Sequence, residues 1–167
     1  MADDRTELRV FLDANILVAG SVWPRWPYEV LQHALKGDYR LVLNAYVIEE
    51  ARRTLTARFQ HEIGRFDAFL ATCNYEKADI PTAEAVAAHS GLVRDIADVP
   101  VALAAIEAGV DCLVSEDKDL TARDESTAEL RQQLSICLSG AFLREVMGWS
   151  TEQLEAVRGR TWRDLAP

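Results

Sequence analysis

Short aliphatic runs separated by longer helical segments are the feature that most constrains this chain. Four runs have the length and composition of buried strands, and they cover residues 8–12, 39–43, 110–115 and 134–138. Strands that alternate with helices need crossover connections, which place the strands parallel and cover both faces of the sheet with helices. The sequence therefore predicts an α/β protein, a three-layer α/β/α sandwich with a mainly parallel central sheet.

The segments between these runs carry helix signals. Apolar residues recur at helical spacing from Tyr28 until Gly37 ends the pattern, and Asn44 is suited to cap the next helix. Residues 21–27, rich in Trp and Pro, are expected to form a loop. Further helices are expected over residues 59–73, 82–86, 98–109 and 139–147, with an edge strand within residues 74–80.

A length of 167 residues suits one compact domain. We expect this domain to cover residues 1–146, followed by a short helical extension over 147–167, where Ser150 and Gln153 form a capping-box pattern for a helix ending near Arg158. No apolar stretch approaches the roughly 20 residues of a transmembrane helix. The acidic N-terminus does not resemble a signal peptide. The sequence therefore predicts a cytoplasmic protein that does not contact a membrane.

The charge balance argues against passive nucleic-acid binding. Eighteen basic and 27 acidic residues give a net charge of −9, which repels a phosphate backbone. An enzyme that meets phosphates through a bound metal ion remains compatible with this balance. Cys73, Cys112 and Cys137 are odd in number and far apart in sequence, so we expect three reduced, buried thiols.

Acidic residues follow the predicted strands at the points where a ligand would bind. In an open α/β sheet, ligands bind beyond the carboxyl ends of the strands. Asp13 directly follows the first strand, and Asp117 comes soon after the third strand. Glu49 and Glu50 lie in the first turns of the helix after the second strand, and Asp98 begins the Ala-rich helix. All four clusters are expected at one rim.

Four carboxylates at one rim indicate a metal site. Without a cation at least one of them would hold a proton, because like charges raise each other's pKa. Mg²⁺ and Mn²⁺ prefer oxygen ligands, and two such ions suit in-line attack on a phosphodiester. The isolated residues His33, His61 and His89 form no competing site for a softer metal.

Each acid also has a purely structural interpretation. Asp98 is a good helix N-cap, and Glu49 and Glu50 are favoured by the helix dipole in a first turn. Asp117 and Asp119 are suited to a solvated loop. Asp13 is the hardest to explain in this way, because a charge that closes a buried strand needs a partner. Periodicity does not choose between Glu49 and Glu50, which flank the apolar stripe equally.

Four segments resemble, in order, the motifs of the PIN-domain nucleases. They are Asp13-Ala-Asn15 after an aliphatic strand, Glu49-Glu50-Ala-Arg52-Arg53, Arg94-Asp95-Ile-Ala-Asp98 before an Ala-rich helix, and Ser115-Glu-Asp117-Lys-Asp119. The resemblance covers about residues 8 to 146. This sequence has Ala14 where Thr is common, Pro100 and Val101 after the third acid, and Glu116 where Gly is frequent.

The resemblance implies a site and an activity. It makes Asp13, Glu50, Asp98 and Asp117 the catalytic, metal-binding acids, with Asn15, Ser115 and Asp119 in support. The family pattern has its acid directly before a small or aliphatic residue, and this favours Glu50 over Glu49. It implies a metal-dependent endoribonuclease that uses Mg²⁺ or Mn²⁺ on RNA, possible pairing with an antitoxin as the toxin of a toxin–antitoxin system, and a homodimer.

Local cations and aromatic residues are candidates for contact with RNA or a second subunit. Arg52 and Arg53 directly follow Glu50 and are the expected substrate-binding residues, with Arg58 further along the helix; all three also suit an ordinary helix surface. Trp23 and Trp26 could stack unpaired bases, but we favour packing in a dimer interface, where Trp is enriched.

Two other classes of function compete with the nuclease. The first is a catalytically silent PIN-like module that binds RNA or protein. The presence of all four acids argues against this alternative. The second is phosphate chemistry on an Asp. A phosphoacceptor domain would have an acidic pair before Asp13, and this sequence lacks that pair. A phosphatase of the Asp-x-Asp type needs a second acid at position 15, where this sequence has Asn15.

Overall fold

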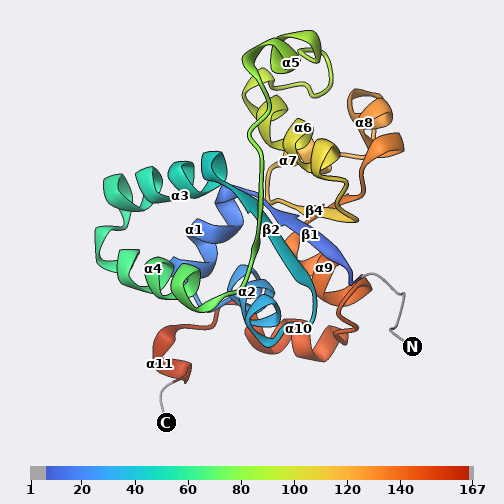
Figure 1. The fold of residues 1–167 in the computed structure, drawn as a ribbon. Helices are drawn as coiled ribbons and strands as arrows, with labels where there is room; N and C mark the ends of the chain where they lie inside the picture. The colour runs from blue at the N-terminus through green and yellow to red at the C-terminus, as the bar shows by residue number, and fades with distance from the viewer. Residues whose placement is uncertain (1–6, 166–167) are drawn as a thin grey trace, which may run out of the picture.

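The computed structural model describes residues 7–165 and confirms the predicted α/β architecture (Figure 1). A five-stranded sheet has the order β3-β2-β1-β4-β5, and every pairing in it is parallel. The strands are β1 (Arg9–Leu12), β2 (Arg40–Asn44), β3 (Glu76–Ala78), β4 (Cys112–Val114) and β5 (Ile136–Cys137).

Helices cover both faces of this sheet and complete a three-layer sandwich. Figure 1 shows α1, α3 and α4 on one side and α6 and α8 on the other. The helices are α1 (Ala14–Val22), α2 (Trp26–Lys36), α3 (Ala45–Arg58), α4 (Ile63–Thr72), α5 (Ala83–Ala88), α6 (Val99–Ala108), α7 (Lys118–Thr121), α8 (Ala128–Gln133), α9 (Ser139–Glu145), α10 (Thr151–Val157) and α11 (Trp162–Leu165).

The central strand β1 explains where a site can form. Val10, Phe11 and Leu12 are fully buried because β1 pairs with both β2 and β4 and is covered by helices on both faces. The strands run parallel, so the residues after Leu12, Asn44 and Val114 emerge at one edge. A hydrogen bond from the Asp13 amide to the Val114 carbonyl (3.0 Å) joins the ends of β1 and β4 there.

Several predicted caps are confirmed. The Asn44 side chain accepts a hydrogen bond from the Val47 amide, and Ser150 and Gln153 form a reciprocal capping box at α10. Gly37 and Gly109 end α2 and α6 with positive φ, the conformation that glycine adopts without strain. The expected edge strand is β3.

The largest difference from expectation lies between β1 and β2. The sequence indicated a loop over residues 21–27, but α1 continues to Val22 and α2 begins at Trp26, so only three residues connect the two helices. Helix α1 itself was not predicted. Seven of its nine residues are buried, so it has no polar face and shows no amphipathic periodicity. The predicted 59–73 helix starts later, as α4 at Ile63, after a 3₁₀ turn at Gln60–Glu62.

Residues after 146 pack against the rest of the chain. The indole N–H of Trp26 donates to the Leu154 carbonyl (2.9 Å), and the Arg158 guanidinium lies over the Trp26 ring. Leu154 is 5% exposed and belongs to the main apolar core. Trp26 therefore packs against the C-terminal segment of its own chain, while the dimer contact that the sequence suggested for it stays a prediction.

The three thiols differ in burial. Cys73 and Cys112 are buried, as expected, whereas Cys137 is half-buried and its sulfur lies 3.4 Å from that of Cys112 on the neighbouring strand.

From residue 7 to residue 165, no helix has both the length and the apolar character that crossing a membrane requires.

Candidate functional site

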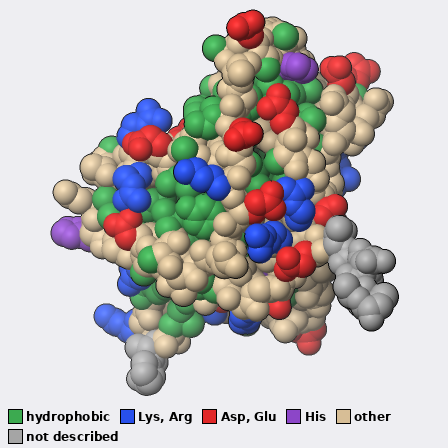
Figure 2. Space-filling model, viewed as in Figure 1, with side chains coloured by type: hydrophobic (Ala, Val, Ile, Leu, Met, Phe, Trp, Pro, Cys, Tyr) green, Lys and Arg blue, Asp and Glu red, His purple; other side chains and the backbone are tan. Residues whose placement is uncertain are grey.

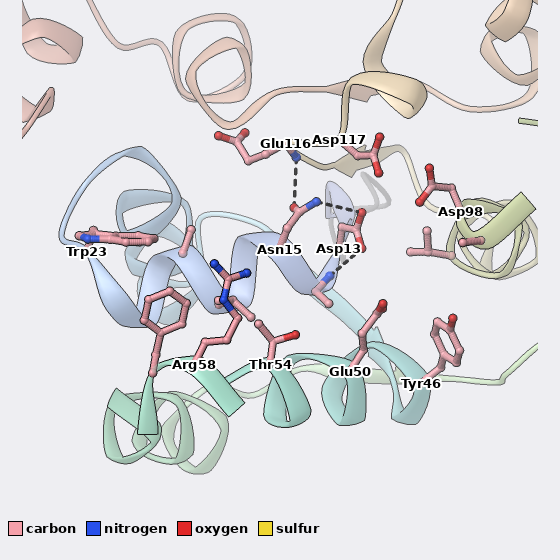
Figure 3. A pocket seen from close by; sticks show the side chains of 16 residues that line it. Asp13, Asn15, Trp23, Tyr46, Glu50, Thr54, Arg58, Asp98, Glu116 and Asp117 are labelled. Carbon is pink, nitrogen blue, oxygen red and sulfur yellow. Dashed lines mark hydrogen bonds between the residues drawn. The ribbon is translucent and has the colours of Figure 1, made fainter. Parts of the chain in front are cut away.

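A cavity of about 400 Å³ opens at the carboxyl edge of the sheet. Helices α1 and α3 form two of its walls, and the segment after β4 and the start of α6 form the others (Figure 3). Its lining includes all four acids that the resemblance selected, namely Asp13, Glu50, Asp98 and Asp117. Residues from four separate parts of the sequence thus meet in one place.

Local structure explains how each acid reaches the cavity. Asp13 ends β1 and caps α1, and Asp117 follows β4 and caps α7. Glu50 lies in the second turn of α3 and is half-buried. Asp98 is the last residue of a 3₁₀ turn (Ile96–Asp98) that leads into α6. The parallel sheet brings Asp13 and Asp117 together, and the helices contribute the other two.

Asp13 is fixed by a network of polar groups. Its Oδ2 accepts hydrogen bonds from the Ser115 hydroxyl (2.8 Å) and from Asn15 Nδ2 (3.4 Å), and its Oδ1 accepts from the Ala14 amide (2.7 Å). Ser115 also accepts from the Asp117 amide (3.0 Å), so one hydroxyl orients both acids. Burial raises the pKa of Asp13 to about 6, despite the hydrogen bonds that lower it.

Asn15, one of the expected supporting residues, lies beside Asp13 and Ser115. Asn15 donates to Ser115 Oγ (3.2 Å) and accepts from the Glu116 amide (3.1 Å), which ties α1 to the segment after β4. Glu116, the acid at a position where glycine is frequent in the family, turns its carboxylate to the Ser139 amide (2.8 Å). The extra charge therefore has a partner at the start of α9.

Asp98 does not behave as a simple helix cap. Its side chain makes no capping hydrogen bond to α6, and its Oδ2 is buried without a hydrogen-bond partner among the described residues. Burial, followed by the charge of the facing Asp117, raises the pKa of Asp98 to about 7. A buried carboxylate oxygen without a partner is costly in a protein unless a cation approaches it.

The charges around the acids suit a hard divalent cation. Asp95, Asp98 and Asp119 each place a carboxylate oxygen within 4.8 Å of the others. Arg94 approaches this group, but it is shared between Asp119 (3.7 Å) and Asp124 (3.5 Å). Carboxylate oxygens are the ligands that Mg²⁺ and Mn²⁺ prefer. The oxygens of Asp95, Asp98 and Asp119 therefore suit such an ion, and Asp98 is the one member that this group shares with the four acids named above.

The arginines of α3 divide between the cavity and other surfaces. Arg52 lies over the Phe66 ring and pairs with Asp67 (2.8 Å), both on α4, so it does not line the cavity. Arg53 is exposed in a shallow depression beside Glu50. Arg58 lines the main cavity. Glu50 lines it as well, whereas Glu49 is exposed and does not.

At the wall opposite the acids, the sequence singled out Trp23 but not its partner Phe59. Trp23 and Phe59 line that end of the cavity, with their ring centroids 5.5 Å apart in an edge-on arrangement. They directly follow the ends of α1 and α3, so their meeting depends on how the two helices pack. Acidic and basic side chains are interspersed on the face drawn in Figure 2, which shows no continuous basic patch.

These features define a class of protein, a three-layer α/β/α domain with an acidic cavity at the carboxyl ends of its strands. The family model for the PIN domain matches residues 9–119, and the chain belongs to the PIN-domain family. Members of this family are generally nucleases, so the chain belongs to the general class of nucleases.

Solved structures share this fold at low sequence identity. PAE2754 from Pyrobaculum aerophilum is 16% identical with a TM-score of 0.56, and the match covers 85% of this chain and 91% of that one. VapBC2 from Rickettsia felis, bound to a DNA fragment from their promoter, is 16% identical with a TM-score of 0.54, covering 78% and 98%. FitAcB from Neisseria gonorrhoeae is 15% identical with a TM-score of 0.52, covering 78% and 97%. No curated protein sequence matches the chain.

Proposed function

We propose that this protein is a metal-dependent endoribonuclease that hydrolyses RNA phosphodiester bonds with Mg²⁺ or Mn²⁺. Asp13, Glu50, Asp98 and Asp117 hold the metal, and Asn15, Ser115 and Asp119 support them. The observation that carries the proposal is the buried Asp98 oxygen without a partner, in a cavity where four carboxylates meet.

The chain's own residues supply orientation and negative charge. Ser115 and Asn15 hold the Asp13 carboxylate by hydrogen bonds and so fix its orientation at the cavity wall. The Asp119 amide donates to Asp117 Oδ1 (2.7 Å) and fixes the second acid in the same way. When bound, the metal ions lower the pKa of a water molecule and stabilise the leaving oxygen.

The partners belong to the proposal as well. We infer that the chain is the toxin of a toxin–antitoxin pair in the cytoplasm and forms a homodimer. The likeness to VapBC2, which was crystallised on promoter DNA, supports the antitoxin. Light scattering should give about twice the 18.6 kDa of one chain, and a mass near 18.6 kDa would contradict the dimer.

A matched pair of variants on one helix tests the activity. We expect the wild type to cleave RNA with Mn²⁺ or Mg²⁺ and to stop when a chelator is added. Glu50→Gln should lower the rate by at least about 100-fold, because a metal ligand becomes neutral, while Glu49→Gln should keep the wild-type rate.

The outcomes separate the nuclease from its competitor. RNA binding without metal-dependent cleavage by the wild type would favour a catalytically silent binding module. Equal loss of activity in both variants, with melting temperatures unchanged, would contradict the assignment of Glu50.

A further inference from the structure

We propose that Trp23 and Arg58 form a subsite for a nucleotide that flanks the cleaved bond in single-stranded RNA. The base stacks on the Trp23 ring, and a phosphate pairs with the Arg58 guanidinium. This inference rests on the proposed ribonuclease function and adds the class of substrate to it.

Trp23 is unlike every other aromatic residue in the described part of the chain. Among the aromatic residues from 7 to 165 it alone is exposed, with 39% of its surface accessible. The other three indole N–H groups are used within the fold: Trp26 donates to the Leu154 carbonyl, Trp149 to His33, and Trp162 to the Val22 carbonyl. The Trp23 indole has no such partner between residues 7 and 165.

The Trp23 ring is nevertheless held in place. Its backbone amide donates to the Ala19 carbonyl at the end of α1, and its ring rests against the edge of Phe59. The next residue, Pro24, is buried, and its carbonyl accepts a hydrogen bond from Arg160 (2.7 Å). The Arg25 guanidinium also lies over this ring, 6.0 Å from its centroid. A rigid, partly exposed aromatic ring beside a guanidinium is the arrangement that binds bases at low entropic cost.

Arg58 supplies the positive charge that the acidic cavity otherwise lacks. It is the one Lys or Arg among the residues found to line the cavity, and Figure 3 shows it pointing inward from α3. Its guanidinium lies over the Phe59 ring (5.5 Å), and no carboxylate in the described chain pairs with it. It is therefore available to a phosphate, in contrast to Arg52.

The spacing places this subsite beyond the nucleotide that is cut. Helices α1 and α3 run side by side, with Asp13 and Glu50 toward their beginnings and Trp23 and Arg58 at their ends. Ten residues of helix from Asp13 to Trp23 span about 15 Å. A base on Trp23 is thus separate from the phosphate at the acids. Only an unpaired base exposes its face to a side chain, so the substrate is single-stranded here.

The experiment uses the full chain and a fluorescein-labelled single-stranded RNA of about ten nucleotides, within the length that one such groove covers. The variants are Trp23→Ala, Trp23→Phe and, as a control on an exposed apolar residue away from the cavity, Leu35→Ala. The readouts are RNA affinity with Ca²⁺, the KM and kcat of cleavage with Mn²⁺, the melting temperature, and the mass by light scattering.

We expect Trp23→Ala to weaken RNA affinity by roughly 5- to 150-fold, the range for loss of one stacked base, with the effect in KM more than in kcat. Trp23→Phe should restore most of the affinity, and Leu35→Ala should match the wild type. If Trp23→Ala folds and keeps its RNA affinity and KM, the subsite is refuted. If Trp23→Ala instead halves the mass and keeps RNA affinity, the residue belongs to a dimer interface, which also refutes it.

Failure of the ribonuclease proposal gives a different pattern. A wild type that binds RNA but cleaves none, with binding lost in Trp23→Ala, would refute catalysis and support the subsite. A wild type that neither binds nor cleaves single-stranded RNA would overturn both proposals.

Discussion

Asp13 shows how one side chain can be required for chemistry and yet costly for the fold. It is 7% exposed, faces Glu50 and Asp117, and has no cationic partner in the described chain. Its hydrogen bonds to Ser115 and Ala14 offset only part of the cost of burial. A residue of this kind is kept for what it binds.

Replacing Asp13 with Asn separates these two roles. The change keeps the size and removes one charge from the cluster, so the metal-free protein should be as stable as the wild type or more stable, by on the order of 1 kcal/mol. Metal affinity and RNA cleavage should fall together. A melting curve with chelator and a Mn²⁺-dependent cleavage rate provide the test. Normal cleavage by Asp13→Asn would refute its catalytic role.

The arginines of α3 give a second comparison between single residues. At about 100° per residue, Arg52 lies about 200° around the helix from Glu50, whereas Arg58 lies only about 80° away. Helical geometry was thus a signal, available in the sequence, that favoured Arg58 over Arg52 as the cation beside the acids. By the same arithmetic Arg53 lies about 60° from Glu50, and it shares a shallow depression with it.

Arg58→Gln should therefore weaken RNA binding several-fold and lower the slope of log affinity against log salt by about 0.7, the effect of one phosphate contact on a single strand. Arg52→Gln is the matched control, because it loses only its contacts with Asp67 and the Phe66 ring, both outside the cavity. Salt titrations of RNA affinity for both variants measure this. An equal loss in the two would indicate a general charge effect.

The secondary structure was predictable wherever an element has two distinct faces or a clear cap. Helix α3 begins at Asn44 and α10 at Ser150, as their capping residues indicated. Helix α1 was not predicted because it is buried on almost every side. The short helices α7, α8 and α11 were not predicted because they have too few turns to show a helical period. Asp13 and Asp117 were predictable from their positions after strands, and Glu50 and Asp98 from their places near helix starts, but the Trp23–Phe59 wall depends on tertiary packing.

The C-terminal helices bear on the expected boundary at residue 146. We propose that residues 1–146 hold the sheet and the acids, while α10 and the segment after it brace the turn between α1 and α2. Arg160 pairs with Glu29 (2.6 Å), and Trp162 packs edge-on against Tyr28. The brace and the turn are thus joined by both charge and aromatic contacts.

Truncation after residue 146 should leave a folded domain with a melting temperature roughly 10 °C lower, because it removes the buried side chains of Leu154 and Val157 and exposes the apolar surface that they cover. Truncation after residue 158 keeps α10 and should lower it by less. Thermal melts followed by circular dichroism measure both. A 1–146 chain without a cooperative transition would refute the boundary, whereas one as stable as the full chain would refute the bracing role of the C-terminal helices.

The protein's stability should depend on pH in a way set by the cavity. A carboxyl whose pKa is raised in the folded chain holds its proton more tightly there than in the unfolded chain. Asp13, with a pKa of about 6, and Asp98, with a pKa of about 7, therefore favour folding fully below pH 3.8, their ordinary value. This contribution is lost as the pH rises from about 4 toward 7.

With a chelator present, the melting temperature of Asp98→Asn should fall less between pH 5 and 8 than that of the wild type, because one of the two raised carboxyls is gone. Millimolar Mg²⁺ or Mn²⁺ should raise the wild-type melting temperature most at the upper end of this range, by binding the folded chain. Sodium at equal ionic strength is the control. Identical pH profiles for both proteins would contradict the cluster.

Because β1 pairs with β4, the site at their ends can form only after the chain has been synthesised through β4. Asp13 leaves the ribosome well before Ser115, which orients it and lies 102 positions later. At about 5–20 residues per second, synthesis takes roughly 5–20 s to cover that distance. The proposed cutting site therefore cannot be assembled on a nascent chain that has not yet passed Asp117. An interrupted translation product ending before that residue carries Asp13 and Glu50 without the means to act on the RNA around it.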